Sequence, residues 1–249
     1  MPQNAPKLQP HLQLDSAHGA VSALLPGDPA RLDRIKPFLT DAVELAYNRE
    51  FRSLAGTYQG ARVLAVSTGI GGASAGIAVE ELHALGIQNM IRIGSCGALQ
   101  PQVKLADLIF VSGTVRDDGA SKAYIDPIYP AVADSALLAA CEKAAQKLGF
   151  AFHTGIARSH DSFYTDREEE IDAYWSQKGV LGCDMETAAL YVIGRLRQVR
   201  CMSILNNVVA YQTDTADAIG SYAGGEDAAM RGEEHEIVTA LEALASLSA

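Results

Sequence analysis

Short apolar runs alternate with amphipathic stretches along most of the chain. Apolar runs rich in β-branched residues predict strands, and apolar positions three or four residues apart predict helices. The predicted strands are residues 21–25, 62–68, 90–93, 108–115, 152–157 and 201–209. The predicted helices are 73–85, 135–148, 168–178, 187–196 and 226–247, with mixed helical character at 31–39. Strands that alternate with helices predict a mostly parallel sheet covered on both faces.

Glycine and proline mark where these elements end. Gly86 and Gly149 each follow a predicted helix, and Pro26-Gly27-Asp28-Pro29 ends the first strand. Residues 1–20 are polar, contain proline and lack periodicity, so we expect an extended N-terminal arm. No linker, repeat or low-complexity segment divides the rest. We therefore expect residues 1–249 to form a single α/β domain.

The composition is that of a globular protein that handles small molecules. Thirty acidic against 20 basic residues give a formal net charge of -10. Such a surface repels nucleic acid and anionic membranes, because binding a phosphate backbone requires a basic stripe. No apolar run approaches the ~20 residues of a bilayer span, and the N-terminus lacks a signal pattern. We expect a soluble, cytoplasmic protein without nucleic-acid or membrane partners.

The cysteines predict neither a disulfide nor a zinc site. They lie far apart and form no CxxC pair, at Cys96, Cys141, Cys183 and Cys201. Both kinds of site need tighter or paired spacing. We expect buried thiols in a reducing compartment.

Two predicted strands run into glycine-rich turns, Gly69–Gly72 and Gly94–Gly97. Turns at the carboxyl ends of parallel strands are where α/β folds bind ligands, and small residues let backbone N–H groups approach an anion. Neither turn fits a P-loop or a dinucleotide fingerprint. Taken alone, each turn is better explained as a tight connection between a strand and a helix.

Three arginines accompany these turns. Arg92 lies inside an otherwise apolar strand, where a charge needs a partner or a ligand. Arg31 follows the Pro-Gly-Asp-Pro turn, and Arg49 lies in the segment YNREF. Together with the Ser95 hydroxyl, three guanidinium groups would make a phosphate clamp, because their planar fork matches phosphate oxygens. The alternative is that each arginine is an ordinary surface or ion-paired residue.

Seven segments of the chain carry a more specific signal when they are taken in order. They are PGDPARL, STGIGGASAGIAVEELHALG, RIGSCGAL, VRDDGAS, YPAVAD, SHDSFY and CDMETAALY. Together they resemble the nucleoside phosphorylase family, which includes uridine phosphorylase and hexameric purine nucleoside phosphorylase. The resemblance implies phosphorolysis of a nucleoside to free base and (deoxy)ribose 1-phosphate, a pentosyltransferase reaction. It also implies an α/β domain with a mixed, partly barrel-like sheet, in a homo-oligomer of dimers, such as a hexamer, with shared active sites.

The resemblance implies roles for individual residues. Those implied to bind phosphate, the co-substrate of an enzyme without other cofactor, are Gly27, Arg31, Arg92 and Ser95, with Arg49 from the neighbouring subunit. Those implied to bind ribose are Met185, Glu186 and, from the arm of the neighbour, His11. Arg31, Arg92 and Glu186 are thus the expected catalytic residues. The alternative for Glu186 is a carboxylate that stabilises a helix N-terminus.

The base and a potassium ion are assigned in the same way. The residues implied to contact the base are Cys96, Gly97, Phe163, Val208 and Val209, with Arg167 as a candidate donor to a uracil carbonyl. The alternative for Phe163 is a core aromatic residue. Glu50, Ile70 and Ser74 match a potassium site at the dimer interface of uridine phosphorylases.

The identity of the base rests on two departures from the family patterns. Purine-specific members carry an aspartate that protonates the base, and this chain has Val209 in its place, which cannot act as an acid. Uridine phosphorylases have an apolar pair there, but their Gln-x-Arg motif is missing from residues 165–169. We therefore predict uridine as the substrate. A purine nucleoside phosphorylase, a hydrolytic nucleosidase and a non-catalytic nucleoside-binding protein remain as alternatives.

Overall fold

The computed structural model describes residues 8–213 and 227–247. Residues 1–7 of the predicted arm and the first residue of the predicted terminal helix lie outside this part. The strands are β1 (Ser22–Pro26), β2 (Thr40–Asn48), β3 (Phe51–Tyr58), β4 (Ala61–Val66), β5 (Asn89–Ala98), β6 (Leu108–Asp117), β7 (Ala131–Val132), β8 (Phe152–His160), β9 (Gly182–Asp184) and β10 (Arg200–Val209). The α-helices are α1 (Arg31–Ile35), α2 (Gly72–Ala84), α3 (Gly119–Tyr124), α4 (Ser135–Leu148), α5 (Glu168–Gln177), α6 (Thr187–Leu196) and α8 (Asp227–Ser246).

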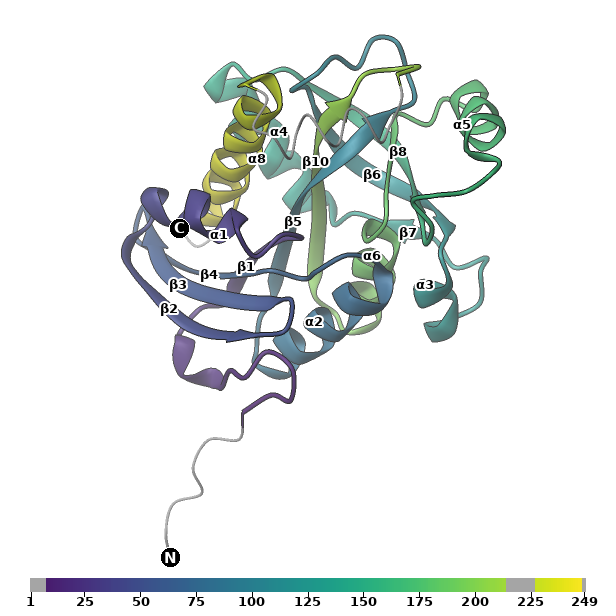
Figure 1. The fold of residues 1–249 in the computed structure, drawn as a ribbon. Coiled ribbons are helices and arrows are strands. Elements are labelled where there is room, and N and C mark those ends of the chain that lie inside the picture. The colour runs from purple at the N-terminus through teal and green to yellow at the C-terminus, as the bar shows by residue number, and fades with distance from the viewer. Residues whose placement is uncertain (1–7, 214–226, 248–249) are drawn as a thin grey trace, which may run out of the picture.

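All ten of these strands join in one mixed sheet, part of which closes on itself (Figure 1). In the open part, β2, β3 and β4 are antiparallel neighbours, and β1 lies parallel between β4 and β5. The order then continues through β9, β8, β6 and β10, and β10 pairs back onto β5. Five strands therefore form a closed ring, which confirms the expected partly barrel-like α/β fold.

The sheet separates two hydrophobic cores. Side chains alternate across each strand, so Ala23 and Leu25 of β1 face one core while Leu24 faces the other. Helices α2 and α6 cover the first core and pack on each other. Helices α1, α4 and α8 cover the second. Strands β1, β4, β5 and β10 are thus buried along most of their length on both faces, as their apolar sequences predict.

The β2–β3 hairpin is the largest element that the periodicity analysis missed. Strand β2 alternates apolar and polar residues, but its apolar members Val43, Leu45 and Tyr47 are exposed in the protomer. Such alternation contains no continuous apolar run, and the buried strand β3 is interrupted by Ser53 and Gly56. Neither strand therefore has the apolar run from which the other strands were predicted. Strands β7 and β9 and helix α3 were missed because they are short.

The second predicted glycine turn is wrong, because Gly94–Gly97 belongs to β5. Parallel pairing with β10 continues to Gly97, and Gly97 and Ala98 also pair with β9. The arm is likewise not extended throughout its described part. Leu12 and Leu14 are buried, and Ser16–His18 forms a 3-10 turn.

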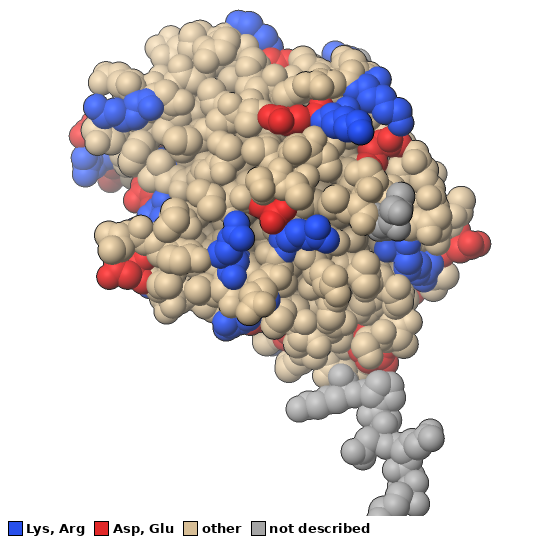
Figure 2. Space-filling view, turned by 180° about the vertical axis from the view of Figure 1, so that it is seen from behind, with Lys and Arg blue, Asp and Glu red and all other residues tan. Residues whose placement is uncertain are grey.

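The surface carries no stripe of one charge on the face shown in Figure 2, where basic and acidic side chains are interspersed. Among the described residues, no helix combines the length and the apolar character that crossing a membrane would require.

The hydroxyl group of Tyr191 joins helix α6 to strands β6 and β10 of the closed ring by hydrogen bonds. Removal of this hydroxyl group tests its contribution to the stability of the fold. The buried hydroxyl donates to Val111 O (2.5 Å) and accepts from Ser203 N (2.9 Å). We expect Tyr191→Phe to lower the free energy of unfolding by about 2 kcal/mol, because two buried backbone groups lose their partner. Urea unfolding measures the loss. The control Tyr174→Phe removes an exposed hydroxyl and should cost less than about 0.5 kcal/mol. Equal effects of the two variants would contradict this role of Tyr191.

Candidate active site

Arg92 lies at the centre of the candidate site and is buried. Its Nη2 donates to Glu186 Oε2 (2.5 Å), and its Nε donates to Asp184 Oδ2 (3.1 Å). Asp184 ends β9, and Glu186 immediately precedes α6. Burial disfavours the charge of Arg92, but the two carboxylates outweigh burial and raise the pKa of Arg92. The guanidinium therefore stays charged inside the protein.

Two glycines make room for this guanidinium group. A Cβ on Gly94 would lie 2.5 Å from Arg92 Nη2, so any larger residue would displace the arginine. A Cβ on Gly27 would lie 3.9 Å from Arg92 Nη1, which places that nitrogen beside the turn after β1. Arg92 Nη1 is buried and has no hydrogen-bond partner among the residues that the structure describes. A buried, charged donor beside a glycine turn is suited to an anion.

Glu186 is held in place by backbone donors as well as by Arg92. Gly71 N, at the start of α2, donates to Glu186 Oε1 (2.6 Å), and Met185 N lies 3.3 Å from Oε2. Burial raises the pKa of Glu186, and Arg92 opposes this shift. The carboxyl group therefore joins the turn after β4 to the strand that carries Arg92.

Arg31 approaches the same region from the other face of the sheet. Its Nη1 donates to Ile93 O (3.1 Å) and to Glu236 Oε1 (3.2 Å), and its Nε lies 3.1 Å from Glu233 Oε2. Glu236 Oε2 also accepts from Gly94 N (3.0 Å). Burial raises the pKa of Glu236 to about 8, against the opposing effect of Arg31. Helix α8 thus holds Arg31 next to the strand that carries Arg92.

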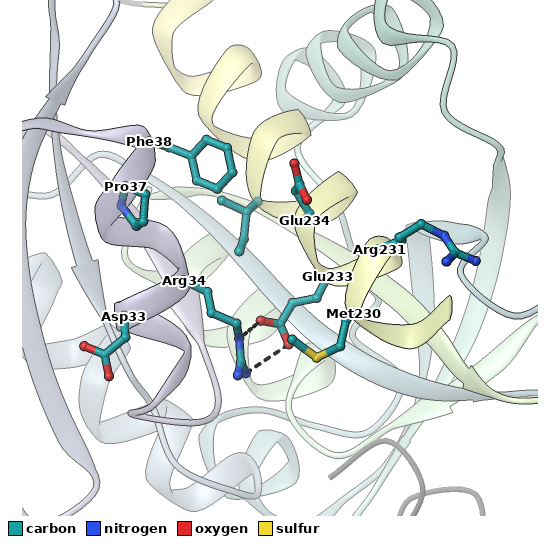
Figure 3. A pocket seen from close by; sticks show the side chains of 9 residues that line it. Asp33, Arg34, Pro37, Phe38, Met230, Arg231, Glu233 and Glu234 are labelled. Carbon is teal, nitrogen blue, oxygen red and sulfur yellow. Dashed lines mark hydrogen bonds and ion pairs between the residues drawn. The ribbon is translucent and has the colours of Figure 1, made fainter. Parts of the chain in front are cut away.

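A cavity of about 550 Å³ lies on the outer side of this arrangement, between α1 and α8 (Figure 3). In it, Arg34 reaches across to Glu233, which also binds Arg31. Its other walls include Phe38, Met230 and Ile237. None of the residues around Glu186 lines it. We therefore interpret this cavity as part of the packing between α1 and α8 that holds Glu233 against Arg31, and not as the substrate site.

A second cavity, of about 480 Å³, contains the predicted base-binding residues Gly97 and Val209. Cys183, which pairs with Gly97, also lines it. Gly97 lies two residues beyond Ser95, about 7 Å along the strand. Cys183 lies three residues before Glu186. Two paired strands thus lead from the arginine and carboxylate cluster to this cavity.

Several predicted residues stand apart from the cluster in the protomer. Arg49 is exposed at the tip of the β2–β3 hairpin, with a positive φ of 56°. His11 Nδ1 lies 2.6 Å from Glu81 Oε1, and its ring meets Phe51 edge-on. Arg167 is exposed and pairs with Glu170 (Nη2 to Oε1, 2.8 Å) instead of facing the cavity.

The remaining predicted residues take the following positions. Phe163 is half-buried against Tyr164. Cys96 and Val208 are buried, and Met185 and Ser95 are half-buried. Glu50 Oε1 accepts from Ser74 Oγ (2.8 Å), while the Ile70 side chain is 80% exposed. Within the described ranges, no group of three or more His, Cys, Asp or Glu side chains could hold a metal ion.

Two carboxylates that contact the site arginines were missed by the sequence analysis. Asp184 pairs with Arg92 and also accepts from Thr187 N (3.0 Å) and Thr187 Oγ1 (2.6 Å), which fixes the start of α6. Because Asp184 directly precedes the predicted ribose-binding residues Met185 and Glu186, the sequence could have indicated it as a site residue. Glu236 gave no signal, because nothing in the sequence distinguishes it from the other acidic residues of a long helix.

Comparison with known proteins identifies relatives over most of the chain. A family model described as the phosphorylase superfamily matches residues 22–234. A uridine phosphorylase of Thermococcus kodakarensis is 38% identical, over 80% of this chain and 76% of the relative. A guanosine phosphorylase of Halorubrum lacusprofundi is 36% identical, over 84% and 88%. A crystal structure of uridine phosphorylase from Vibrio fischeri has a TM-score of 0.91 and 43% identity, over 98% of this chain and 100% of that one.

The buried carboxyl group of Glu236 predicts a dependence of stability on pH. The folded protein keeps this proton up to about pH 8, whereas the ordinary value is 4.5. Its contribution to stability is complete below pH 4.5 and is lost as the pH rises to about 8, with a slope of up to about 1.4 kcal/mol per pH unit. We expect Glu236→Gln to flatten the fall in the free energy of unfolding between pH 5 and 8. Urea unfolding across this range measures the slope.

The exposed Glu170 provides the matched control, because Arg167 lowers the pKa of Glu170 and moves its titration below this range. The free energy of unfolding of Glu170→Gln should fall with pH as steeply as that of the wild type. An equally steep fall in Glu236→Gln would show that Glu236 does not cause the pH dependence.

Proposed function

This chain belongs to the phosphorylase superfamily, and we propose that within this family of pentosyltransferases it splits uridine with inorganic phosphate. The products are uracil and ribose 1-phosphate. The observation that carries the proposal is that one terminal nitrogen of Arg92 binds a carboxylate while the other is left for a ligand. Its Nη2 holds Glu186, while its buried Nη1 beside Gly27 has no partner among the described residues. One guanidinium group can therefore join a phosphate to the carboxylate that binds the sugar.

The chemistry follows from these positions. A phosphate oxygen attacks C1′ of the ribose, and the bond from C1′ to the base nitrogen breaks with its electron pair going to the base. The released uracil anion then takes a proton from water to give uracil. Phosphate bound by Arg31 and Arg92 beside C1′ supplies the nucleophile without the entropic cost of encounter, and its negative charge stabilises the cationic sugar. Glu186 accepts from the ribose hydroxyls and fixes the sugar for attack in line. Ser95 and Met185 complete the phosphate and ribose contacts in this proposal.

The base assignment rests on the end of β10. Val209 lines the second cavity, which we call the base-side cavity. Purine-specific members have an acidic side chain at this position, but valine cannot donate a proton to the leaving base. The uracil anion is delocalised over two carbonyl groups and therefore needs less help to leave. Cys96, Phe163 and Val208 are proposed as its apolar surroundings. A purine nucleoside is the second candidate, because the guanosine phosphorylase relative is almost as similar as the uridine phosphorylase.

We further propose that the active site is shared between two protomers. The exposed apolar residues of β2, together with Ile70, form a surface that suits a partner. Arg49 at the hairpin tip would then reach the phosphate of the neighbouring protomer, and His11 its ribose. A dimer of this kind is the building block of the proposed hexamer.

A potassium ion at this interface is a further part of the proposal. Glu50 and Ser74 offer a carboxylate and a hydroxyl oxygen, which are the hard ligands that such a cation prefers. A Cβ on Gly69 would lie 2.7 Å from Glu50 Cγ, so the glycine turn wraps closely around this carboxylate. The Ile70 carbonyl is the third proposed ligand. When bound, the ion would neutralise facing carboxylates of two protomers.

We propose the cytoplasm as the location of the enzyme. All four cysteines are free thiols, and burial raises the pKa of Cys141 and Cys201. Unpaired, unreactive thiols suit a reducing compartment.

A nucleoside panel assayed with and without phosphate tests the proposed reaction. We expect uracil release from uridine only when phosphate is present, with kcat/KM at least about tenfold above that for inosine. Glu186→Gln should lower kcat/KM about 100-fold, because the ribose loses a charged acceptor. The control Glu80→Gln, at a surface pair with Arg197, should keep wild-type activity. Cleavage that ignores phosphate would indicate a hydrolase, and preference for inosine would end the uridine assignment.

Mixing two defective variants tests the shared site. Arg49→Ala and Glu186→Gln each impair every site of their own homodimer. In a mixed dimer, one site combines an intact Glu186 with the intact Arg49 of the other protomer. Refolding an equal mixture should therefore restore about a quarter of the wild-type activity, because half of the dimers are mixed and half of their sites are intact. If the mixture shows only the average of the two variants, each protomer works alone.

A further inference from the structure

The wall of the base-side cavity formed by α5 carries acidic groups that the proposed reaction does not use. Glu168, Asp172 and Ser176 recur every four residues and therefore share one face of the helix, which lines the cavity. Ser176 Oγ lies 3.4 Å from Tyr211 Oη, which links this face to the segment after β10. Helix α5 and Gly97 therefore line the same cavity, and α5 contributes carboxylates to its wall.

Asp172 is a partly enclosed carboxylate of this face. Its side chain is 30% exposed, and it makes no hydrogen bond to any residue in the described ranges. Arg158 Nη1 lies 3.9 Å from Asp172 Oδ1, which is too far for a hydrogen bond. Arg158 is already bound to Asp117 through Nε (2.9 Å) and Nη2 (2.8 Å). Arg158 therefore orients Asp172 without using its acceptor capacity.

The surroundings of Asp172 favour a neutral hydrogen-bond donor as its partner. Burial raises the pKa of Asp172, and the nearby Glu168 raises it further, while Arg158 opposes the shift. A partly buried carboxylate that lacks donors gains most from an N–H group brought by a ligand.

We propose that Asp172 determines base specificity by accepting a hydrogen bond from a ring N–H of the base. The inference rests on the proposed function, since it takes this cavity as the base site. Uracil presents such an N–H between two carbonyl groups, and hypoxanthine and guanine present one next to a carbonyl group. Cytosine and adenine have a lone pair on the corresponding ring nitrogen, which repels a carboxylate. The substrate class is therefore nucleosides whose base carries an amide-type ring N–H, and cytidine and adenosine are rejected.

The test exchanges the carboxylate for an amide, which can donate as well as accept. Asp172→Asn is compared with the wild type for phosphorolysis of uridine and cytidine, and Glu170→Gln serves as the control. Glu170 lies on the same helix and loses the same charge, but it pairs with Arg167 outside the cavity. We expect the ratio of kcat/KM for uridine over cytidine to fall at least about tenfold in Asp172→Asn and to stay within about twofold in the control. An unchanged ratio in Asp172→Asn would overturn the inference.

A binding measurement separates failure of this inference from failure of the proposed function. Calorimetric titration of free uracil and free cytosine into the wild type, Asp172→Asn and Asp172→Ser needs no turnover. Preference for uracil that is lost in both variants supports the role of Asp172 even if no nucleoside is split. Uracil preference that survives in both folded variants, or its absence from the wild type, contradicts this role, whatever the phosphorolysis assay shows.

Discussion

The buried ion pair of Arg92 with Glu186 and Asp184 is the interaction on which the site depends. A guanidinium group can be taken out of water only if charged acceptors meet it with good geometry. Here the two carboxylates come from either side of the junction between β9 and α6, and Arg92 comes from the middle of β5. The pair therefore needs β5, β9 and α6 to be assembled, and a glycine at position 94 beneath the guanidinium group. Fold and site are fixed by the same contacts.

The charges around the two arginines explain how an anion can bind in an acidic protein. Four carboxyl groups from β9, the start of α6 and α8 face Arg31 and Arg92. If all four were ionised, the cluster would repel phosphate. Burial raises the pKa of Glu236 to about 8, so this group keeps its proton at neutral pH and reduces the negative charge beside Gly94. In the proposed dimer, Arg49 of the partner would add positive charge. Local arrangement rather than net charge thus decides what the site attracts.

Much of the fold was predictable because its central strands and long helices are buried in a regular pattern. The bounds of α4 and α6 agree with those predicted from periodicity, and Gly149 marks the end of α4 as expected. The β2–β3 hairpin was missed because β2 alternates apolar with polar residues and β3 is interrupted by Ser53 and Gly56, so neither strand contains a long apolar run. Motifs marked Arg92 and Glu186, which the structure brings into contact. No motif marked Glu236 and Asp172, because their positions beside Arg31 and in the second cavity depend on how helices α8 and α5 pack.

The most direct measurement is a double-mutant cycle between Arg92 and Glu186, read from the free energy of unfolding in urea. Each single change, Arg92→Met or Glu186→Gln, leaves a buried charged or polar partner without its counterpart, whereas the double change removes both. The account predicts a coupling energy of at least about 2 kcal/mol, with the double variant more stable than the sum of the single effects allows. Additive effects, within about 0.5 kcal/mol, would show that this pair does not organise the site.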